Sequence, residues 1–258
     1  MDPSTDHVVR RLQSAGCVFA EDEATELRGV APDAAHLDEL VARRCEGEPL
    51  PWLVGSVEFG GMRLAISAGV YVPRPHTEPL AERGASLLPD GGHAIDLCTG
   101  CGAIAATLRR HRPNAQIMGT DIDPSAVACA ASNGVDARLG SLFEGVDADW
   151  QGAVDLVIGV LPYVPTSELA LLARDVQAYE PRLALDGGDA GLDLIDRAIE
   201  AAPRWLRPGG SIVLELGGEQ QRQVGSSLVR AGFGDVRDLH DEDGDLRGIE
   251  ARLLPGRA

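Results

Sequence analysis

The sequence predicts an α/β fold: a mostly parallel sheet with helices on both faces, an antiparallel terminal hairpin and a small N-terminal helical cap. Three observations support this fold class. From residue 94 onward the spacing of apolar residues alternates between the period of a strand and that of a helix, which is typical of a parallel sheet. Two alternating runs near the end of the chain flank a turn-rich segment. Residues 5–47 keep helical spacing.

The helical cap is expected to cover residues 1–50. One apolar face belongs to a first helix that ends at Gly16, and another belongs to a helix that ends near Gly47. These two faces consist of Val8, Val9, Leu12, Ala15, Leu37, Leu40 and Val41. A segment of this length is too short to build much of a core of its own.

Residues 51–72 are predicted to form a β-hairpin that links the cap to the main domain, residues 73–258. Two alternating runs, Leu53–Phe59 and Met62–Ile66, flank a glycine pair that favours a tight turn. The prolines of Val72-Pro73-Arg74-Pro75 then fix an extended backbone, and a helix is expected to start near Thr77.

The main domain is predicted to alternate strands and helices. Apolar runs of strand length lie at 94–97, 116–121, 154–158 and 212–216. Segments with helical spacing lie between and after them, at 103–111, 124–133, 191–205 and 219–231. Val236–Leu239 and Gly248–Leu253 flank the acidic turn Asp241–Asp245, so we expect an antiparallel edge on the parallel sheet and a solvated turn.

Charge and composition narrow the possible functions. A formal net charge of -17 opposes binding to the phosphates of nucleic acids. No apolar run approaches the roughly 18 residues that cross a membrane, and Met1–Thr5 lacks the order of a signal peptide, so we expect a cytoplasmic protein without a membrane partner. The five scattered cysteines are expected to be reduced thiols. The oligomeric state stays open.

A glycine-containing loop, Asp96–Ala103, lies between the first strand of the main domain and the next helix. Gly100 and Gly102 let a ligand approach the backbone at a helix N-terminus, although a tight turn without a ligand is the alternative. About 20 residues later Asp121 ends the next strand, where a carboxylate can accept hydrogen bonds from two ribose hydroxyls. Because no third glycine follows Gly102, the loop fits S-adenosylmethionine (SAM) better than a dinucleotide.

From about Gly47 to Arg252, a series of motifs in fixed order resembles the HemK/PrmC-type protein-(glutamine-N5) methyltransferases, which modify peptide-chain release factors. Besides the glycine loop, the motifs are Glu48-Pro49-Leu50, Gly55-Ser56-Val57-Glu58-Phe59, Pro73-Arg74-Pro75-His76-Thr77-Glu78, Asp121-Ile122-Asp123, Ser141-Leu142-Phe143-Glu144, Pro162-Tyr163-Val164-Pro165, Glu180-Pro181-Arg182-Leu183-Ala184-Leu185 and Gly187-Gly188-Asp189-Ala190-Gly191-Leu192. The resemblance implies a Rossmann-like class I methyltransferase fold with a seven-stranded sheet, and SAM as the cofactor.

The resemblance also implies roles for single residues. The loop from Gly100 to Gly102 would hold the methionine part of SAM, and Asp121 would hold the ribose. Ser141 would lie on the adenine side, with the base between Ile122 and Leu142. Two further residues of the motif, Asp96 and Thr99, complete the expected cofactor site. Where the family usually has Asp-Leu-Gly-Thr-Gly-Ser-Gly, this sequence has Cys98 and Cys101, a change that suits cofactor binding if the backbone angles accept a non-glycine residue.

The acceptor loop departs from the family. The family's Asn-Pro-Pro-Tyr is Val160-Leu161-Pro162-Tyr163 in this chain, and these four residues are the catalytic candidates. In the family, the asparagine side chain and a neighbouring backbone carbonyl hold the acceptor amide with its nitrogen aimed at the sulfonium methyl. Valine neither donates nor accepts a hydrogen bond. An unpaired buried amide costs about 1 to 3 kcal/mol, so ordinary glutamine methylation is in doubt.

Other side chains are candidates for acceptor binding. Tyr163 would contact the acceptor or else cap the strand end, and Arg74, Thr77 and Glu78 would close the acceptor pocket. Thr77 and Glu78 also suit the N-terminus of a helix. Glu180 and Arg182 would shape the pocket or form a buried ion pair. His76 stands where the family often has aspartate, as a base or as a surface histidine. No metal site is expected from the lone pair Cys98 and Cys101.

Three hypotheses follow. The first is a SAM-dependent methyltransferase that acts on an amine, hydroxyl or imidazole of a small molecule or peptide rather than on the glutamine of a release factor. The second is a SAM-consuming cyclase or lyase, because a closed pocket without an acceptor clamp would favour attack within the cofactor itself. The third is a SAM-binding protein without turnover.

Overall fold

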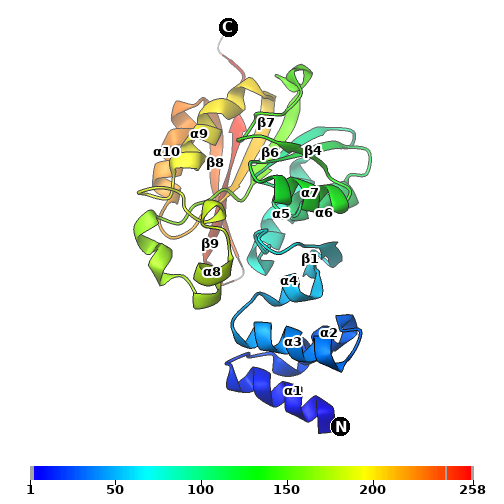
Figure 1. Cartoon of the computed structure of the whole chain (residues 1–258). Coiled ribbons are helices and arrows are strands. Elements are labelled where there is room, and N and C mark those ends of the chain that lie inside the picture. The colour runs from blue at the N-terminus through cyan, green and yellow to red at the C-terminus, as the bar shows by residue number, and fades with distance from the viewer. Residues whose placement is uncertain (1–2, 242, 257–258) are drawn as a thin grey trace.

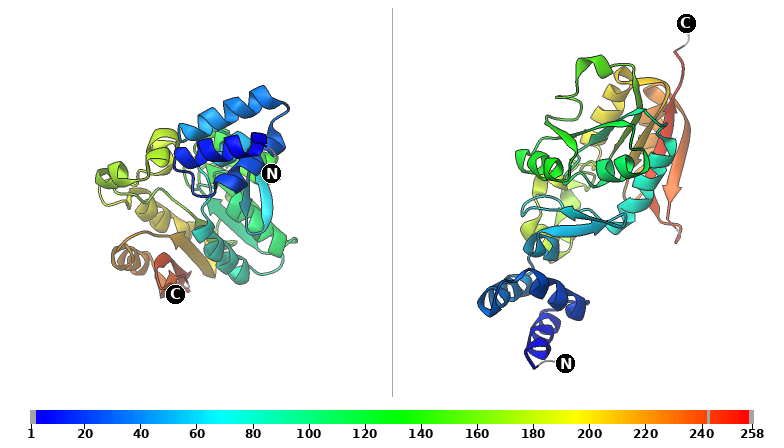
Figure 2. Two further views of the ribbon diagram at one scale, coloured as in Figure 1. Left: turned by 90° about the horizontal axis from the view of Figure 1, so that it is seen from below. Right: turned by 90° about the vertical axis from the view of Figure 1, so that its right-hand side faces the viewer.

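The computed structural model describes residues 3–241 and 243–256. The first two residues of the expected cap, Glu242 of the acidic turn and the last two residues of the expected main domain lie outside the described residues. The seven-stranded sheet lies in the upper part of Figure 1, and the N-terminal helices project below it. The right-hand view in Figure 2 shows the same separation.

The N-terminal helices pack around a small core of their own. They are α1 (Pro3–Ser14), α2 (Ala20–Val30), α3 (Ala34–Cys45) and the short α4 (Leu50–Val54). Leu12, Leu27 and Val41 are fully buried between them. Asp33 caps α3, because its carboxylate accepts a hydrogen bond of 2.9 Å from the backbone of His36. The helix α2 was not predicted.

The hairpin is shorter than the sequence suggested. β1 (Ser56–Phe59) pairs with β2 (Met62–Ala65) in antiparallel register. Leu53 and Val54 were predicted to belong to its first strand, and this was wrong, since they form the end of α4. Pro51 favours the first turn of that helix, and Gly55, at φ 73°, ends it in the left-handed conformation.

The main sheet confirms the predicted fold class. Its strand order is β5-β4-β3-β6-β7-β9-β8, with parallel pairing from β5 to β7 and antiparallel pairing from β7 to β8. The strands are β3 (His93–Leu97), β4 (Gln116–Asp121), β5 (Asp136–Leu139), β6 (Val154–Gly159), β7 (Leu206–Glu215), β8 (Phe233–His240) and β9 (Leu246–Leu253). The short polar edge strand β5 was not predicted.

Helices cover both faces of this sheet. One face packs against α5 (Glu78–Leu87), α6 (Ala103–His111) and α7 (Pro124–Ser132). The other packs against α9 (Asp193–Ala201) and α10 (Gln221–Arg230). The segment between β6 and α9 contains the short helix α8 (Arg174–Tyr179) and two 3-10 turns, Thr166–Leu171 and Arg182–Ala184. Further 3-10 turns lie at Pro75–Thr77, Ala148–Trp150 and Ala202–Arg204.

The register places the carboxyl ends of four parallel strands at one edge of the sheet. Leu97 of β3 lies opposite both Thr120 of β4 and Gly159 of β6, and Gly159 lies opposite Leu214 of β7. The chain order of the strands reverses between β3 and β6, which is the position where open α/β sheets bind ligands. The glycine loop and the acceptor loop begin at this edge.

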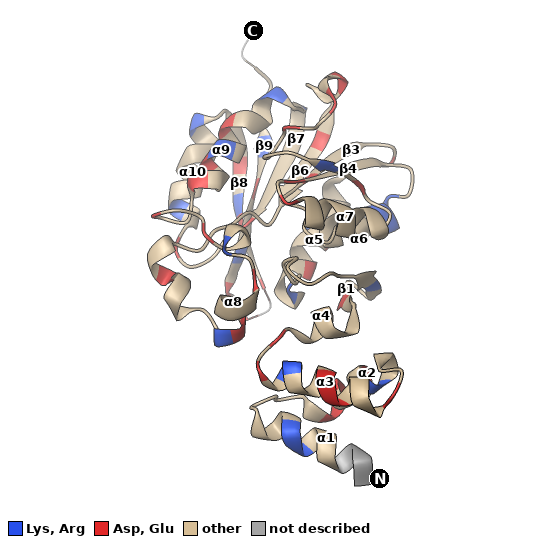
Figure 3. Cartoon of the chain, viewed as in Figure 1, with Lys and Arg blue, Asp and Glu red and all other residues tan. Residues whose placement is uncertain are grey.

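Three further properties concern the described part of the chain as a whole. Among the described helices, none has the length and apolar character needed to cross a membrane. The five cysteines, all within the described residues, form no disulfide. Acidic and basic residues are distributed along the ribbon of both the helical cap and the sheet domain, as Figure 3 shows.

Candidate cofactor and acceptor pocket

A pocket at the carboxyl edge of the sheet brings together residues from both predicted sites. From the cofactor set it is lined by Asp96, Thr99, Gly100, Asp121, Ile122, Ser141 and Leu142, and from the acceptor set by Thr77, Val160 and Pro162. The predicted residues that lie behind or beside this lining are Gly102, Leu161, Tyr163, Arg74, Glu78 and Glu180.

Gly102 packs within the fold rather than facing the pocket. It adopts φ 82°, and a Cβ there would lie 2.8 Å from the side chain of Val135. A Cβ on Gly100 would instead meet nothing within 4 Å in the described structure. Gly100 therefore leaves open space at the pocket wall, whereas Gly102 allows α6 and α7 to approach each other.

Asp96, which is buried, fixes the glycine loop through hydrogen bonds. One carboxylate oxygen, Oδ2, accepts hydrogen bonds from the Thr99 hydroxyl at 2.6 Å and from the backbone of Ala105 at 3.2 Å. Within residues 3–241 and 243–256, the other oxygen, Oδ1, has no hydrogen-bond partner. Burial raises the pKa of Asp96 to about 7, although the bonds from Thr99 and Ala105 act in the opposite direction.

Asp121 joins the end of β4 to the same loop. Its two oxygens accept backbone hydrogen bonds of 2.9 Å, one from Gly100 and one from Asp123. Burial raises the pKa of this carboxyl group, and the two backbone bonds oppose the rise. Each carboxylate oxygen has a second lone pair, so Asp121 can fix the loop and still accept further hydrogen bonds.

The adenine side of the predicted site is formed by chain segments after β4 and β5. Ile122 is 54% exposed and Leu142 is buried, and both line the pocket. Arg197 of α9 also lines it and donates a 3.4 Å hydrogen bond to the Ser141 hydroxyl. Sequence analysis missed Arg197, because a single arginine on an amphipathic helix gives no local signal of a site.

Cys98 occupies a conformation that favours glycine. Its φ of 55° lies in the left-handed region, where a side chain costs roughly 1 to 2 kcal/mol. The side chain is half-buried and packs against the core cluster on the α9 face. The cysteine thus occupies this position at a cost, at a φ within the small left-handed region that a non-glycine residue can adopt.

The acceptor end of the pocket is mainly apolar. Val160 follows β6 directly, is half-buried and packs against the core cluster of the α5 face. The lining of the same pocket also includes the apolar residues Phe59, Val70, Pro73 and Leu183. The side chain at position 160 can form no hydrogen bond with an acceptor molecule, because valine has neither a donor nor an acceptor group.

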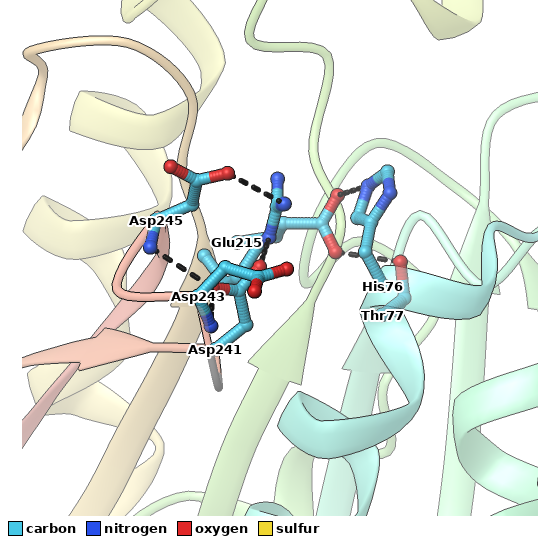
Figure 4. A network of polar contacts seen from close by, with 7 residues as sticks. His76, Thr77, Glu215, Asp241, Asp243 and Asp245 are labelled. Atoms are coloured by element: carbon cyan, nitrogen blue, oxygen red, sulfur yellow. Dashed lines mark hydrogen bonds and ion pairs between the residues drawn. The ribbon is translucent and has the colours of Figure 1, made fainter.

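Behind the acceptor loop lies a buried carboxylate that sequence analysis missed. Glu215 ends β7, accepts 2.6 Å and 3.2 Å hydrogen bonds from the hydroxyls of Thr77 and Tyr163, and lies 3.5 Å from His76 Nε2. Figure 4 shows Glu215 between His76 and Thr77 on one side and the acidic turn on the other. Burial, together with Glu215, raises the pKa of Tyr163. The sequence did contain a signal of this site: Glu215 is an acidic residue that interrupts the apolar run 212–216 near the end of a strand.

Arg74 and Glu180 form an ion pair beside the pocket. Arg74 Nη2 donates to Glu180 Oε1 at 2.5 Å, and the guanidinium lies 4.9 Å from the centre of the Tyr71 ring. Burial raises the pKa of Glu180, and Arg74 opposes the rise. The buried-pair alternative for Glu180 thus has a different partner from the one suggested, because Arg182 pairs with Asp186 at 2.8 Å.

The remaining candidates are Glu78 and a metal site. Glu78 is half-buried in the first turn of α5, where a carboxylate interacts favourably with the helix dipole. In the described part of the chain, no group of three or more His, Cys, Asp or Glu side chains could hold a metal ion.

Comparisons with known proteins identify the family. The model of the methyltransferase small domain matches residues 80–164. A release factor glutamine methyltransferase of Geobacter sulfurreducens is 37% identical over 83% of this chain and 76% of its own. One from Cereibacter sphaeroides is 39% identical over 85% and 80%. A solved structure of a 16S rRNA methyltransferase from T. thermophilus, in complex with AdoMet and guanosine, has a TM-score of 0.52 and is 21% identical in sequence. The match covers 78% of this chain and 44% of that one, and this similarity shows the fold. The chain therefore belongs to the release factor glutamine methyltransferase family and is a SAM-dependent methyltransferase.

Proposed function

We propose that this enzyme transfers the methyl group of SAM to an amine or imidazole nitrogen of a small molecule or peptide, rather than to a glutamine amide. The observation that carries the proposal is Val160, which lines the pocket at the position of the family's acceptor-binding asparagine. The resemblance supplies that correspondence through the neighbouring Pro162 and Tyr163.

The residues at the other end of the pocket fit SAM. Asp96 Oδ1 is a buried acceptor for which the described residues supply no donor, and the wall at Gly100 is open where a Cβ would lie. Asp121 keeps lone pairs for ribose hydroxyls, and Ile122 and Leu142 offer apolar contacts to a base. Bound there, SAM supplies a methyl group made electrophilic by the sulfonium.

The acceptor chemistry follows from what surrounds Val160. The nitrogen of an amide shares its lone pair with the carbonyl group, so it needs hydrogen bonds that align it and stabilise the charge it develops. Val160 supplies none, and leaving the amide unpaired costs about 1 to 3 kcal/mol. A neutral amine or an imidazole has a localised lone pair and needs only positioning. The apolar side chains of Phe59, Val70 and Leu183 would position an acceptor with apolar surface.

The test is product analysis with three kinds of sample. The enzyme is incubated with SAM alone, with SAM and a release-factor peptide containing Gly-Gly-Gln, and with SAM and a panel of amines and imidazoles. Mass spectrometry follows S-adenosylhomocysteine, methylthioadenosine and the methylated acceptors, with Asp121→Ala as the background control. We expect methylated amine or imidazole and little methylated peptide.

The other outcomes identify the rival functions. Efficient methylation of the peptide would refute the proposed acceptor class and restore the activity for which the relatives are named. Methylthioadenosine in the sample with SAM alone would indicate chemistry within the cofactor. SAM binding without any product in the three samples would indicate a binding protein.

A further inference from the structure

The buried carboxylate of Glu215 connects the pocket with the molecular surface. It is 1% exposed, and its partners come from two distant parts of the chain, the 75–77 turn and the acceptor loop. Burying a carboxylate costs several kcal/mol unless it is well paired, so a purely structural contact at this place would be served better by a neutral side chain.

Thr77 forms the inner end of the connection. Its hydroxyl belongs to a residue that lines the pocket, and it donates a 2.6 Å hydrogen bond to Glu215 Oε2. Thr77 stands at the N-cap position of α5, where a threonine hydroxyl usually accepts a hydrogen bond from the first turn of the helix. Here the hydroxyl is directed to Glu215, and its lone pairs remain available as acceptors for a group in the pocket.

His76 forms the outer end. Its Nε2 lies 3.5 Å from Glu215 Oε1, and its side chain is 37% exposed to solvent. Figure 4 shows both contacts of Glu215, one to His76 and one to Thr77, in a single view. The three side chains thus form a continuous path from the pocket, through a buried carboxylate, to water.

The other charged or titratable groups near Glu215 are unsuited to carry a proton. Tyr163 and Tyr71 interact with Glu215, and burial raises the pKa of both phenols, that of Tyr71 to about 12. Arg247 also interacts with Glu215, and hydrogen bonding to Asp241 raises the pKa of its guanidinium. In this cluster a carboxylate and an imidazole are the groups that commonly accept and release protons in enzymes.

We propose that Thr77, Glu215 and His76 form a proton relay that deprotonates the methyl acceptor, an inference that rests on the proposed amine or imidazole function. An alkylammonium ion has no free lone pair until it loses a proton. That proton passes to Thr77 Oγ1 while the hydroxyl proton of Thr77 passes to Glu215 Oε2. Rotation of the carboxyl group presents the proton to His76 Nε2, and the imidazolium releases it to water. The electron pair of the broken N–H bond stays on the acceptor nitrogen.

The experiment measures kcat for methylation of the best amine with the full-length enzyme. Glu215→Gln and Thr77→Val interrupt the relay with little change in size, and each should lower kcat on the order of 100-fold. Thr77→Ser keeps the hydroxyl and should stay within about threefold of the wild type. His76→Ala should lose about tenfold, and free imidazole in the buffer should restore the formation of methylated amine, which mass spectrometry separates from any methylated imidazole.

Controls separate the relay from general damage. His111 pairs with Glu82 at 2.9 Å on the surface, so His111→Ala removes a comparable His–Glu contact away from the pocket and should leave kcat unchanged. Calorimetry of SAM binding checks that each variant keeps its cofactor site. If Glu215→Gln fails to fold, two measurements still test the relay. These are the rescue of His76→Ala by imidazole and the difference in kcat between Thr77→Ser and Thr77→Val.

Each outcome has a distinct meaning. A wild-type enzyme that methylates no amine or imidazole overturns the proposed function and the relay together. An active wild type, with Glu215→Gln within threefold of it, overturns the relay alone. The relay is also overturned if Thr77→Ser is as slow as Thr77→Val, or if imidazole fails to restore His76→Ala.

Discussion

The two ends of the pocket differ in how tightly their side chains are tied to the backbone. At the cofactor end, Asp121 accepts a hydrogen bond from the main chain of Gly100 in the glycine loop, and Asp96 accepts hydrogen bonds from the Thr99 hydroxyl and from the main chain of Ala105 in α6. The loop conformation therefore depends on both carboxylates. At the acceptor end, Val160 packs against the apolar core cluster of the α5 face, and its side chain has no group that could hold the backbone by a hydrogen bond. A residue that holds the backbone cannot change without altering the loop, whereas Val160 is replaceable within the same fold. Under the proposed function, this difference would account for a family member that keeps its cofactor site while its acceptor site changes.

The largest expected effect is the pH dependence of the free energy of unfolding that results from burying the carboxyl group of Asp96 at the cofactor end. The pKa of Asp96 rises from 3.8 to about 7 on burial, so the folded protein binds this proton more tightly than the unfolded chain does. The stabilisation is fully present below pH 4 and is lost as the pH rises through 7. Without cofactor, the contribution of Asp96 to the free energy of unfolding should therefore fall by up to about 4 kcal/mol between pH 4 and 8.

Urea denaturation at a series of pH values checks this prediction. Asp96→Asn should remove most of the decline, because an amide does not titrate. Asp186→Asn serves as a control of opposite sign: Thr166 and Arg182 lower the pKa of Asp186, so its contribution is lost only as the pH falls below 4. Parallel pH profiles for the wild type and Asp96→Asn would contradict the assignment.

The next effect tests whether the cofactor end depends on its backbone hydrogen bonds. Asp121→Ala removes the acceptor for Gly100 and Asp123, and it also removes the proposed ribose partner. We expect the Kd for SAM, measured by calorimetry, to rise about 100-fold, since hydrogen bonds to a charged group are worth about 1.5 to 3 kcal/mol each. Asp136→Ala, at an exposed aspartate of β5 paired with Arg138, should leave the Kd unchanged. If the Kd for SAM rises less than threefold in Asp121→Ala, the cofactor end does not depend on this carboxylate, and the difference described between the two ends of the pocket is wrong.

At the acceptor end, one substitution should move the enzyme toward its relatives. Val160→Asn restores a side chain that can hold an amide, so methylation of the Gly-Gly-Gln peptide should become at least about tenfold faster, corresponding to about 1.4 kcal/mol. Val160→Leu keeps the position apolar and should bring no gain. If Val160→Asn leaves the peptide rate unchanged, some other feature of the acceptor end excludes the amide.

The sequence was sufficient for the parts of the site that rest on local signals. Asp96 and Asp121 lie at the carboxyl ends of the apolar strands β3 and β4, and Gly100 follows β3 within three residues. Their position at the ends of parallel strands predicts that they meet at one edge of the sheet. Their placement around one pocket agrees with that expectation, while their roles toward SAM stay predictions.

Other features depend on the whole fold. Glu215 acquires its role only when Thr77 and Tyr163, 138 and 52 residues away, are brought to it. The strand β5 is short and polar because it lies at the edge of the sheet, so its apolar pattern is weak. Leu53 and Val54 belong to a short apolar run, which periodicity alone cannot assign to a strand or a helix.

The smallest expected effect separates backbone strain from contact with the cofactor. Gly100 has φ 56° and Gly244 has φ 85°, and a Cβ at either position meets nothing within 4 Å of the described structure. Gly100→Ala and Gly244→Ala should each destabilise the protein by about 1 kcal/mol in urea denaturation, because alanine is strained at positive φ. Only Gly100→Ala should also weaken SAM binding, by about fivefold, since its methyl group enters the pocket. Equal SAM affinities for the two variants would mean that the open wall at Gly100 is not where the cofactor binds.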